Sequence, residues 1–230
     1  MNLARLAFLV LAARPLAAFL TGADVVGREH LPKAGPAIIA ANHTSHVDTL
    51  LLLTIFPARL MGRVRPVAAA DYFLRGPLIG WFSRTFVGIV PVARGGQGDV
   101  LAPAREALAQ GDIVIIFPEG TRGPPTDALG PLKAGVARLA AAFPQAPVTP
   151  VWIEGAGRVL PKGAVFPAPM NCTVLVGEPL AWSGDRAAFM EGLRASLEAL
   201  RTRAPPQRWL GEGAWPDPPP TSGGAAPSGR

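Results

Sequence analysis

Strand-like and helix-like segments alternate along most of this chain, and their order constrains the fold more than any other feature. Short apolar runs rich in Val and Ile are followed by segments whose apolar residues recur at helical spacing. The alternation predicts a single α/β domain, with a largely parallel or mixed central sheet flanked by helices. Strands are expected at residues 24–31, 37–41, 66–70, 87–92, 112–117, 148–153 and 172–176. Helices are expected at residues 47–55, 78–82, 99–111 and 132–142.

The two ends of the predicted domain have different character. At its end, Asp185 is expected to start an amphipathic helix with Phe189, Leu193, Leu197 and Leu200 on one stripe. From Ala204 onward the chain holds seven prolines and five glycines and shows no periodicity. We therefore predict one folded domain at residues 24–203, followed by a disordered Pro/Gly-rich tail at 204–230.

Residues 1–23 form an apolar segment interrupted by Arg5, Arg14 and Pro15. A spanning helix needs about 20 mostly apolar residues, and the uninterrupted run at residues 6–13 supplies eight. We expect a short helix or helix pair, broken near Pro15, that associates with a membrane interface and holds Arg5 and Arg14 at headgroup level. A helix buried against its own domain fits the composition equally well.

The formal charge of +6 comes almost wholly from arginine. A surplus of cations suits anionic partners, but no dense basic run with interleaved aromatic residues marks a nucleic-acid reader. Phosphorylated metabolites or a membrane surface are the favoured partners. Cys172 is the single cysteine, which excludes an internal disulfide and fits a reducing compartment. Its apolar surroundings favour a packing role over that of a thiol nucleophile.

Two polar clusters follow predicted strands. The first, N-H-T-S-H-V-D at residues 42–48, follows the strand at 37–41, and the second, F-P-E-G-T-R at 117–122, ends the strand at 112–117. Ligands of open α/β sheets bind beyond the carboxyl ends of the strands, so both clusters are expected to line one crevice. A hydroxyl beside a guanidinium, as at Thr121 and Arg122, suits phosphate binding.

His43 and Asp48 can form a general base and the carboxylate that orients it. Five residues span about 140° on a regular helix, so the pair meets only if the chain between them turns into the helix. In the alternative interpretation Asn42, Thr44 or Ser45 caps the helix, and both histidines make structural hydrogen bonds. His46 is expected to be structural.

The two clusters together resemble the glycerolipid acyltransferase family, the lysophospholipid acyltransferase group that includes the 1-acylglycerol-3-phosphate O-acyltransferases. Weaker family blocks follow the same order: G-I-V-P-V-A-R at 88–94, L-K-A-G-V-A-R-L-A at 132–140 and V-T-P-V at 148–151. The likeness spans about residues 24–180. One departure is Ala93, because the family usually has a polar residue there.

The resemblance implies that His43 is the base and that Asp48 orients it. It places the phosphate or polar head of the acceptor among residues of the second and third blocks: Arg94, Glu119, Gly120, Thr121 and Arg122. Pro150 would lie near the path of the acyl donor.

The function implied is transfer of a fatty acyl group from acyl-CoA or acyl-carrier protein to the hydroxyl of a lysophospholipid. No cofactor is expected, and the scattered histidines and cysteine offer no metal-ligand spacing. The protein is expected to be peripheral or monotopic on the cytoplasmic face of a membrane, with no nucleic-acid partner. An acyl-thioester hydrolase and a non-catalytic peripheral lipid-binding protein remain alternatives.

Overall fold

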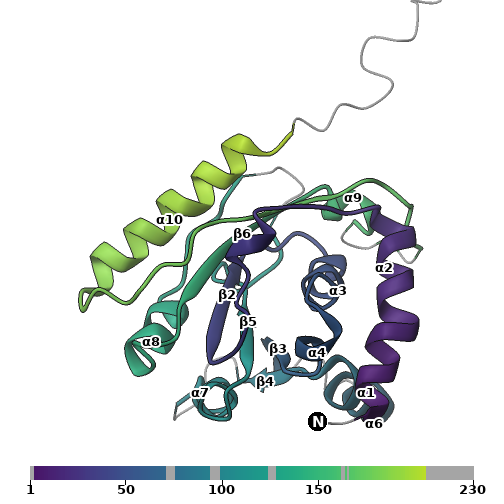
Figure 1. Cartoon of the computed structure of the whole chain (residues 1–230), viewed down its shortest axis with the longest axis horizontal. Helices are drawn as coiled ribbons and strands as arrows, with labels where there is room; N and C mark the ends of the chain where they lie inside the picture. The colour runs from purple at the N-terminus through teal and green to yellow at the C-terminus, as the bar shows by residue number, and fades with distance from the viewer. Residues whose placement is uncertain are drawn as a thin grey trace, which may run out of the picture.

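A seven-stranded mixed sheet forms the centre of the computed structural model, with helices on both faces (Figure 1). The structure describes residues 3–70, 76–93, 99–123, 128–161, 164 and 166–205. The strands are β1 (Asp24–Val26), β2 (Ala37–Ala41), β3 (Val64–Ala69), β4 (Val90–Val92), β5 (Ile113–Ile116), β6 (Val148–Glu154) and β7 (Thr173–Val176). Their order is β1-β7-β6-β2-β5-β3-β4.

Five neighbouring strands, from β6 to β4, are parallel. β7 runs antiparallel to β6, and β1 is parallel to β7, so these two strands run in the opposite direction. The predicted α/β class with a parallel or mixed sheet is therefore confirmed. All residues of β2 and β5 are buried, as expected for central strands covered on both faces.

Two hydrophobic cores lie on opposite faces of the sheet. One face carries α3 (His46–Thr54), α4 (Ala58–Met61), α9 (Ala156–Val159) and the N-terminal helix, and the other carries α7 (Ala102–Ala109), α8 (Gly135–Ala142) and α10 (Arg186–Arg203). Successive strand residues point to opposite faces, so Ile39 and Ala41 of β2 join the first core while Ile38 and Ala40 join the second.

The ends of several elements follow from local signals. Asp185 caps α10 by accepting a hydrogen bond from the Ala188 N–H at 2.7 Å, and the predicted stripe of that helix is buried. The strand expected at 24–31 ends at Val26, because the chain turns at Gly27 into the short 3-10 helix η2 (Arg28–His30). The strand expected at 87–92 is shortened to β4, because the preceding residues continue α6 (Pro77–Phe82) as the π turn η3 (Ser83–Val87).

The N-terminal segment is one continuous helix made of α1 (Leu3–Phe8), the π turn η1 (Leu9–Ala13) and α2 (Arg14–Thr21). The break expected near Pro15 is wrong: the wider π turn η1 directly before this residue accommodates the proline, and the helix continues through it. Among the described residues, Leu3–Thr21 is the one helix long and apolar enough to cross a membrane by length and composition. Leu9, Ala13 and Leu20 nevertheless belong to the first core, so the helix packs on the domain.

Arg5 does not lie at headgroup level, which corrects the expectation from the sequence. Its side chain is buried, and its guanidinium donates to the carbonyls of Val64 at 2.7 Å and Val87 at 3.0 Å. It also donates to the carbonyls of Gly62 and Phe86. Gly62 ends α4, and Phe86 and Val87 end η3, where helical C=O groups lack intrahelical partners, while Val64 is the first residue of β3. Arg5 therefore fastens the N-terminal helix to the domain.

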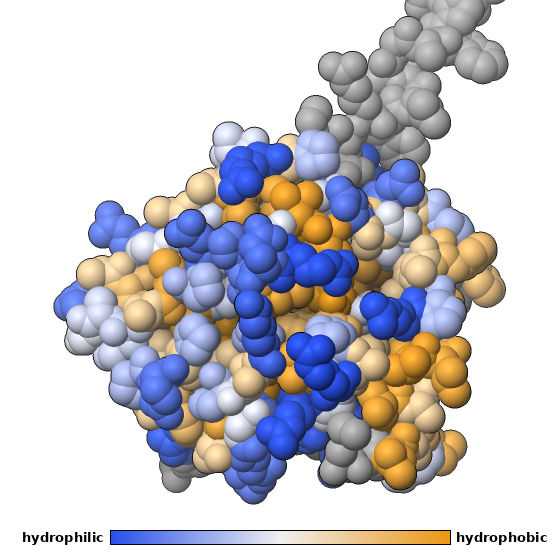
Figure 2. Space-filling view, viewed as in Figure 1, coloured by the Kyte–Doolittle hydropathy of each residue, from blue (hydrophilic) through white to orange (hydrophobic). Residues whose placement is uncertain are grey.

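Large exposed apolar side chains are concentrated on the N-terminal helix and on α6. They are Leu3, Leu11, Leu16 and Phe19 on the N-terminal helix and Leu78, Ile79, Trp81 and Phe82 on α6. The two helices are joined through Phe8, whose ring lies 5.4 Å from that of Phe82 and 5.2 Å from that of Phe86. Figure 2 shows hydrophobic residues gathered where Figure 1 places α1 and α6. We call these eight residues the apolar face.

Cys172 is buried, and burial raises the pKa of its thiol to about 12. Both properties agree with the packing role expected from the sequence. The tail predicted to be disordered lies, from residue 206 on, outside the described residues.

Candidate active site

The two polar clusters meet at one edge of the sheet, as predicted. β2 and β5 are hydrogen-bonded parallel neighbours, so their carboxyl ends reach the same edge. His43 follows β2, and Glu119 follows β5. The backbone N–H of His43 donates to Oε1 of Glu119 at 3.0 Å, and the carbonyl of His43 accepts from the N–H of Gly123 at 2.8 Å. The loop after β5 is therefore bonded directly to the loop that carries His43.

His43 and Asp48 are in contact. Nδ1 of His43 lies 2.9 Å from Oδ2 of Asp48, whose side chain is fully buried. The same oxygen accepts from the N–H groups of Thr44 at 2.6 Å and Ser45 at 2.8 Å. Helix α3 begins at His46, after His43, so the chain between the pair is a turn and the rotation of a regular helix does not separate them.

The helix cap and the partner of His43 are the same residue. Ser45 is the N-cap of α3, and Asp48 at the third helical position completes a capping box by accepting from the Ser45 N–H. Ser45 therefore caps the helix, and Asp48 also contacts His43; the catalytic role of the pair stays a prediction. Capping fixes the Asp48 carboxylate in place before any substrate arrives.

The His43 ring is held on two sides. It stacks on Phe117, with 4.1 Å between ring centroids and 18° between planes, and its side chain is 16% exposed. When Asp48 accepts from Nδ1–H, the tautomer leaves Nε2 without a proton. Nε2 has no hydrogen-bond partner among the described residues, so it is the nitrogen able to take a proton from a ligand.

Glu119 connects loops through both of its carboxylate oxygens. Oε1 accepts from the His43 N–H, and Oε2 accepts from the Gly130 N–H at 3.2 Å. In this arrangement Glu119 positions the backbone around His43. Its expected contact with substrate stays a prediction.

Two cations lie on the loop that follows β5. Gly120 has φ +72°, and a Cβ there would come within 2.6 Å of Nζ of Lys133, so the Lys133 side chain lies across this glycine. Arg122 is half-buried, and Thr121 beside it is exposed. The pKa of His46 is lowered from its usual value, first by burial and then by the positive charge of nearby Arg122. Arg122 and Lys133 therefore place two positive charges on this loop, alongside the carboxylate of Glu119.

One predicted site residue, Pro150, lies away from this place, and the position of a second is not described. Arg94 lies outside the described residues. Pro150 lies inside β6, opposite Ala40, where its carbonyl accepts from the Gly177 N–H at 2.9 Å. Its ring contacts the side of the sheet covered by α10, because a Cβ on Gly177 would meet both Pro150 and Leu200. The role of Pro150 on the acyl-donor path stays a prediction.

The sequence offered Asn42 as a helix cap, but Ser45 is the cap and the Asn42 side chain extends the sheet. Nδ2 donates to the Ile153 carbonyl at 2.9 Å, and Oδ1 accepts from the Ile153 N–H at 2.7 Å. The amide thus continues the β2–β6 ladder past the end of β2 and fixes the start of the His43 loop. Phe117 and Lys133 were also not assigned to the site, because their contacts with His43 and with Gly120 depend on the tertiary structure.

The fold and this site define the class of protein. Residues 22–154, more than half of the chain, match the family model described as Acyltransferase. The chain belongs to this family. The matched span includes both polar clusters and ends at the last residue of β6.

Individual relatives carry more specific names. The chain is 32% identical over 145 residues to 1-acyl-sn-glycerol-3-phosphate acyltransferase BAT2, chloroplastic, of Brassica napus, covering 61% of this chain and 40% of that protein. It is 31% identical over 188 residues to 1-acyl-sn-glycerol-3-phosphate acyltransferase of Bacillus subtilis, covering 79% of this chain and 86% of that one. The chain thus spans less than half of the plant relative and most of the bacterial one.

A solved structure has the same fold. The crystal structure of the 1-acyl-sn-glycerophosphate (LPA) acyltransferase PlsC from Thermotoga maritima aligns with a TM-score of 0.65 at 26% identity. The alignment covers 85% of this chain and 79% of that one, so the likeness includes the sheet and the helices on both of its faces.

Proposed function

We propose that this protein is an O-acyltransferase that moves a fatty acyl group from an acyl thioester to the free hydroxyl of a 1-acylglycerol-3-phosphate. The observation that carries the proposal is the His43–Asp48 pair, with 2.9 Å between Nδ1 and Oδ2 and with Nε2 left open at the carboxyl edge of the sheet. The names of the relatives support the acceptor. The donor, acyl-CoA or acyl-carrier protein, is the one that the resemblance to the glycerolipid acyltransferase family implies.

The reaction needs two proton transfers, one to His43 and one from His43. Nε2 of His43 takes the proton of the acceptor hydroxyl as its oxygen attacks the thioester carbonyl. The new C–O bond forms, the C–S bond breaks, and the departing sulfur receives the proton from the imidazolium. Asp48 stabilises that imidazolium through Nδ1–H, and Phe117 keeps the ring in its plane.

The phosphate of the acceptor is assigned to the loop that follows β5. Arg122 offers a planar fork of donors, and Lys133 adds a second positive charge across Gly120. Thr121 offers a hydroxyl beside them. Together these groups suit an anionic head within reach of the base.

The apolar face supports an interfacial location. A lysophospholipid is delivered from a bilayer, and Leu11 and Phe19, 76% and 73% exposed, would otherwise place apolar surface in water. We place the protein as peripheral or monotopic on the cytoplasmic side of a membrane, with the N-terminal helix lying in the interface.

The test is an acyl-transfer assay with purified protein, 1-acylglycerol-3-phosphate and acyl-CoA in mixed micelles, read by mass spectrometry. His43→Ala should lower kcat by about 10²-fold or more, since general-base catalysis supplies about 10²–10⁴-fold. The matched control, His30→Ala, removes a histidine on η2, away from this edge, and should keep wild-type activity. A folded His43→Ala variant with near-normal turnover overturns the mechanism. Release of free fatty acid that does not depend on the acceptor would identify a hydrolase instead.

A further inference from the structure

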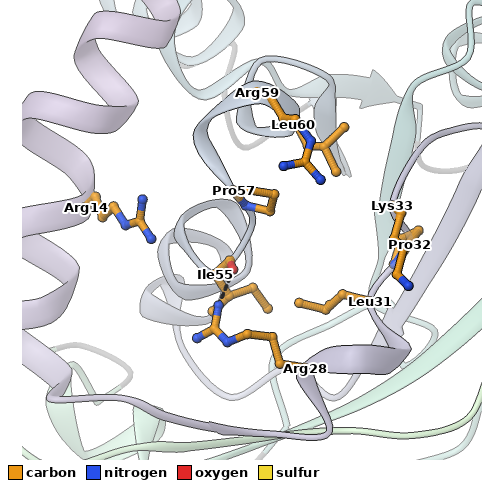
Figure 3. Close-up of a pocket in the computed structure, with 9 residues that line it drawn as sticks. All are labelled: Arg14, Arg28, Leu31, Pro32, Lys33, Ile55, Pro57, Arg59 and Leu60. Carbon is orange, nitrogen blue, oxygen red and sulfur yellow. Dashed lines mark hydrogen bonds between the residues drawn. The ribbon is translucent and has the colours of Figure 1, made fainter.

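A second polar site lies at the other end of α3. It is a pocket of about 340 Å³ between α2, α4 and the segment that leads into β2 (Figure 3). Four cations surround it: Arg14, Arg28, Lys33 and Arg59. Its floor is apolar and includes Ile55 and Leu60. We call this site the basic pocket.

The charge of the basic pocket is uncompensated. No acidic side chain occurs among the residues that line it. Within the described part of the chain, none of its four cations forms an ion pair with a carboxylate. Figure 3 shows the guanidinium groups of Arg14, Arg28 and Arg59 pointing toward the space beside Ile55 and Pro57. Binding an anion would reduce the repulsion between these positive charges.

The geometry favours a phosphate group over a simple counter-ion. Arg28 donates to the carbonyl of Ile55 at 2.8 Å, which anchors one guanidinium at the C-terminal end of α3. The remaining donors approach from α2 and from α4, so an anion in the pocket can be contacted from several directions. Arginine forks match the oxygens of a phosphate in this manner.

The basic pocket is separate from the proposed catalytic site. His43 and Asp48 lie at the N-terminal end of α3, and the pocket lies at its C-terminal end. Nine helical residues span about 14 Å at 1.5 Å each. An anion held in the pocket therefore does not meet the reacting atoms at His43.

The pocket opens beside the apolar face. Arg14 belongs to the N-terminal helix, and its neighbours in that helix include Leu11 and Leu16, which are 76% and 50% exposed. A bilayer in contact with these side chains would bring its headgroup layer to the cations. Positive side chains bordering exposed apolar ones are the arrangement by which interfacial helices bind acidic lipid.

We propose that the basic pocket binds the phosphate headgroup of an anionic phospholipid of the membrane, at a site other than the acceptor site. The proposal rests on the interfacial location proposed above, but not on acyl transfer at His43. Binding of the lipid phosphate in the basic pocket would hold the protein on acidic membranes and fix the orientation of the N-terminal helix there.

Vesicle binding by the full chain tests the proposal. Flotation would compare vesicles of phosphatidylcholine alone with vesicles that also contain phosphatidic acid. The wild type should bind the acidic vesicles more tightly. Arg14→Ala/Arg59→Ala should weaken that binding by roughly thirty-fold, as expected for the loss of two cations at an anionic surface, and should leave binding to neutral vesicles unchanged.

Two further variants make the test specific. Arg138→Ala/Arg186→Ala removes the same charge from exposed positions on α8 and α10 and should bind as the wild type does. Arg14→Lys/Arg59→Lys keeps the charge and should retain most of the affinity. Turnover in neutral detergent micelles should be the same for all variants, which shows that each is folded.

Three results would overturn the proposal. Equal losses in the Arg14/Arg59 and Arg138/Arg186 variants would mean that net charge alone attracts the protein to acidic vesicles. Thermal stabilisation by inorganic phosphate that depends on Arg14 and Arg59, with unchanged vesicle binding, would assign the pocket to a soluble phosphate. Failure of the wild type to bind any vesicle would also contradict the interfacial location. The micelle assay of acyl transfer is independent of that result and tests the proposed function separately.

Discussion

The backbone N–H of His43 donates a hydrogen bond to the side chain of Glu119, 76 residues further along the chain, at 3.0 Å. The other oxygen of Glu119 holds the N–H of Gly130. The position of the proposed base thus depends on a carboxylate from a neighbouring strand end. Glu119 is therefore a positioning residue in this structure.

Glu119→Gln should lower kcat by about tenfold. Glu119 accepts a hydrogen bond at each of its two oxygens, whereas the glutamine amide has only one oxygen that can accept. The acceptor KM should change little if Glu119 acts only through the His43 loop. Steady-state kinetics with the acceptor varied measure both quantities. Glu106→Gln, an exposed position on α7, is the matched control and should be silent. A raised KM with unchanged kcat would instead show that Glu119 contacts the acceptor.

Asp48→Asn should lower both kcat and stability, because Asp48 serves His43 and the capping box of α3 together. Loss of a helix cap costs about 0.5–2 kcal/mol, and loss of the charge beside the imidazolium should lower kcat by about 10²-fold or more. Ser45→Ala separates the two effects, since it weakens the cap and leaves the carboxylate. Thermal melts and turnover should be measured on both variants. If Ser45→Ala loses as much turnover as Asp48→Asn, Asp48 acts only through the helix.

Gly120→Ala should be destabilising by about 1–2 kcal/mol, because its left-handed backbone strains an L residue. The added methyl would also displace the side chain of Lys133, so the acceptor KM should rise. Gly192→Ala is the matched control: it lies within α10 with open space around it and should be neutral or stabilising. Urea unfolding and the acceptor KM report the two effects. An unchanged KM in Gly120→Ala would count against Lys133 as a phosphate contact.

Arg122→Ala should raise the KM for 1-acylglycerol-3-phosphate more than it lowers kcat, because it removes binding shared by the ground state and the transition state. The same variant should discriminate less between this acceptor and a monoacylglycerol, which has no phosphate. Arg138→Ala on α8 provides the control for loss of one positive charge. Equal losses on both acceptors would contradict the assignment of phosphate to Arg122.

His46 should make the folded state sensitive to mild acid. Burial, followed by the nearby Arg122 and His43, lowers the pKa of His46 below its usual 6.5. The unfolded chain therefore binds a proton more readily, so stability is fully present above about pH 6.5 and is lost as pH falls toward the lower folded pKa. His46→Asn should reduce this loss in melting temperatures measured from neutral to acidic pH. A wild-type-like pH profile in that variant would assign the effect to another group.

Much of the fold follows from local patterns. The strand at residues 37–41 and the buried stripe of α10 match their predicted positions, because alternation and helical spacing show which side chains must be buried. The shortened strands β1 and β4 were harder to predict, because short apolar runs fit strands and turns of helix equally. The sequence predicted that the clusters containing His43 and Glu119 share one edge of the sheet, but it did not predict the hydrogen bond between the two residues.

The sequence by itself determined the α/β class, the order of the elements and the residues of the two polar clusters, because these depend on periodicity and on residue chemistry within short windows. Only the tertiary structure decided that Asp48 both caps α3 and holds His43, and that Arg5 is buried against backbone carbonyls. It also gathered Arg14, Arg28, Lys33 and Arg59 around one pocket. Composition cannot distinguish a buried arginine from an interfacial one, since the difference depends on which distant carbonyls, cations and apolar surfaces packing brings to it.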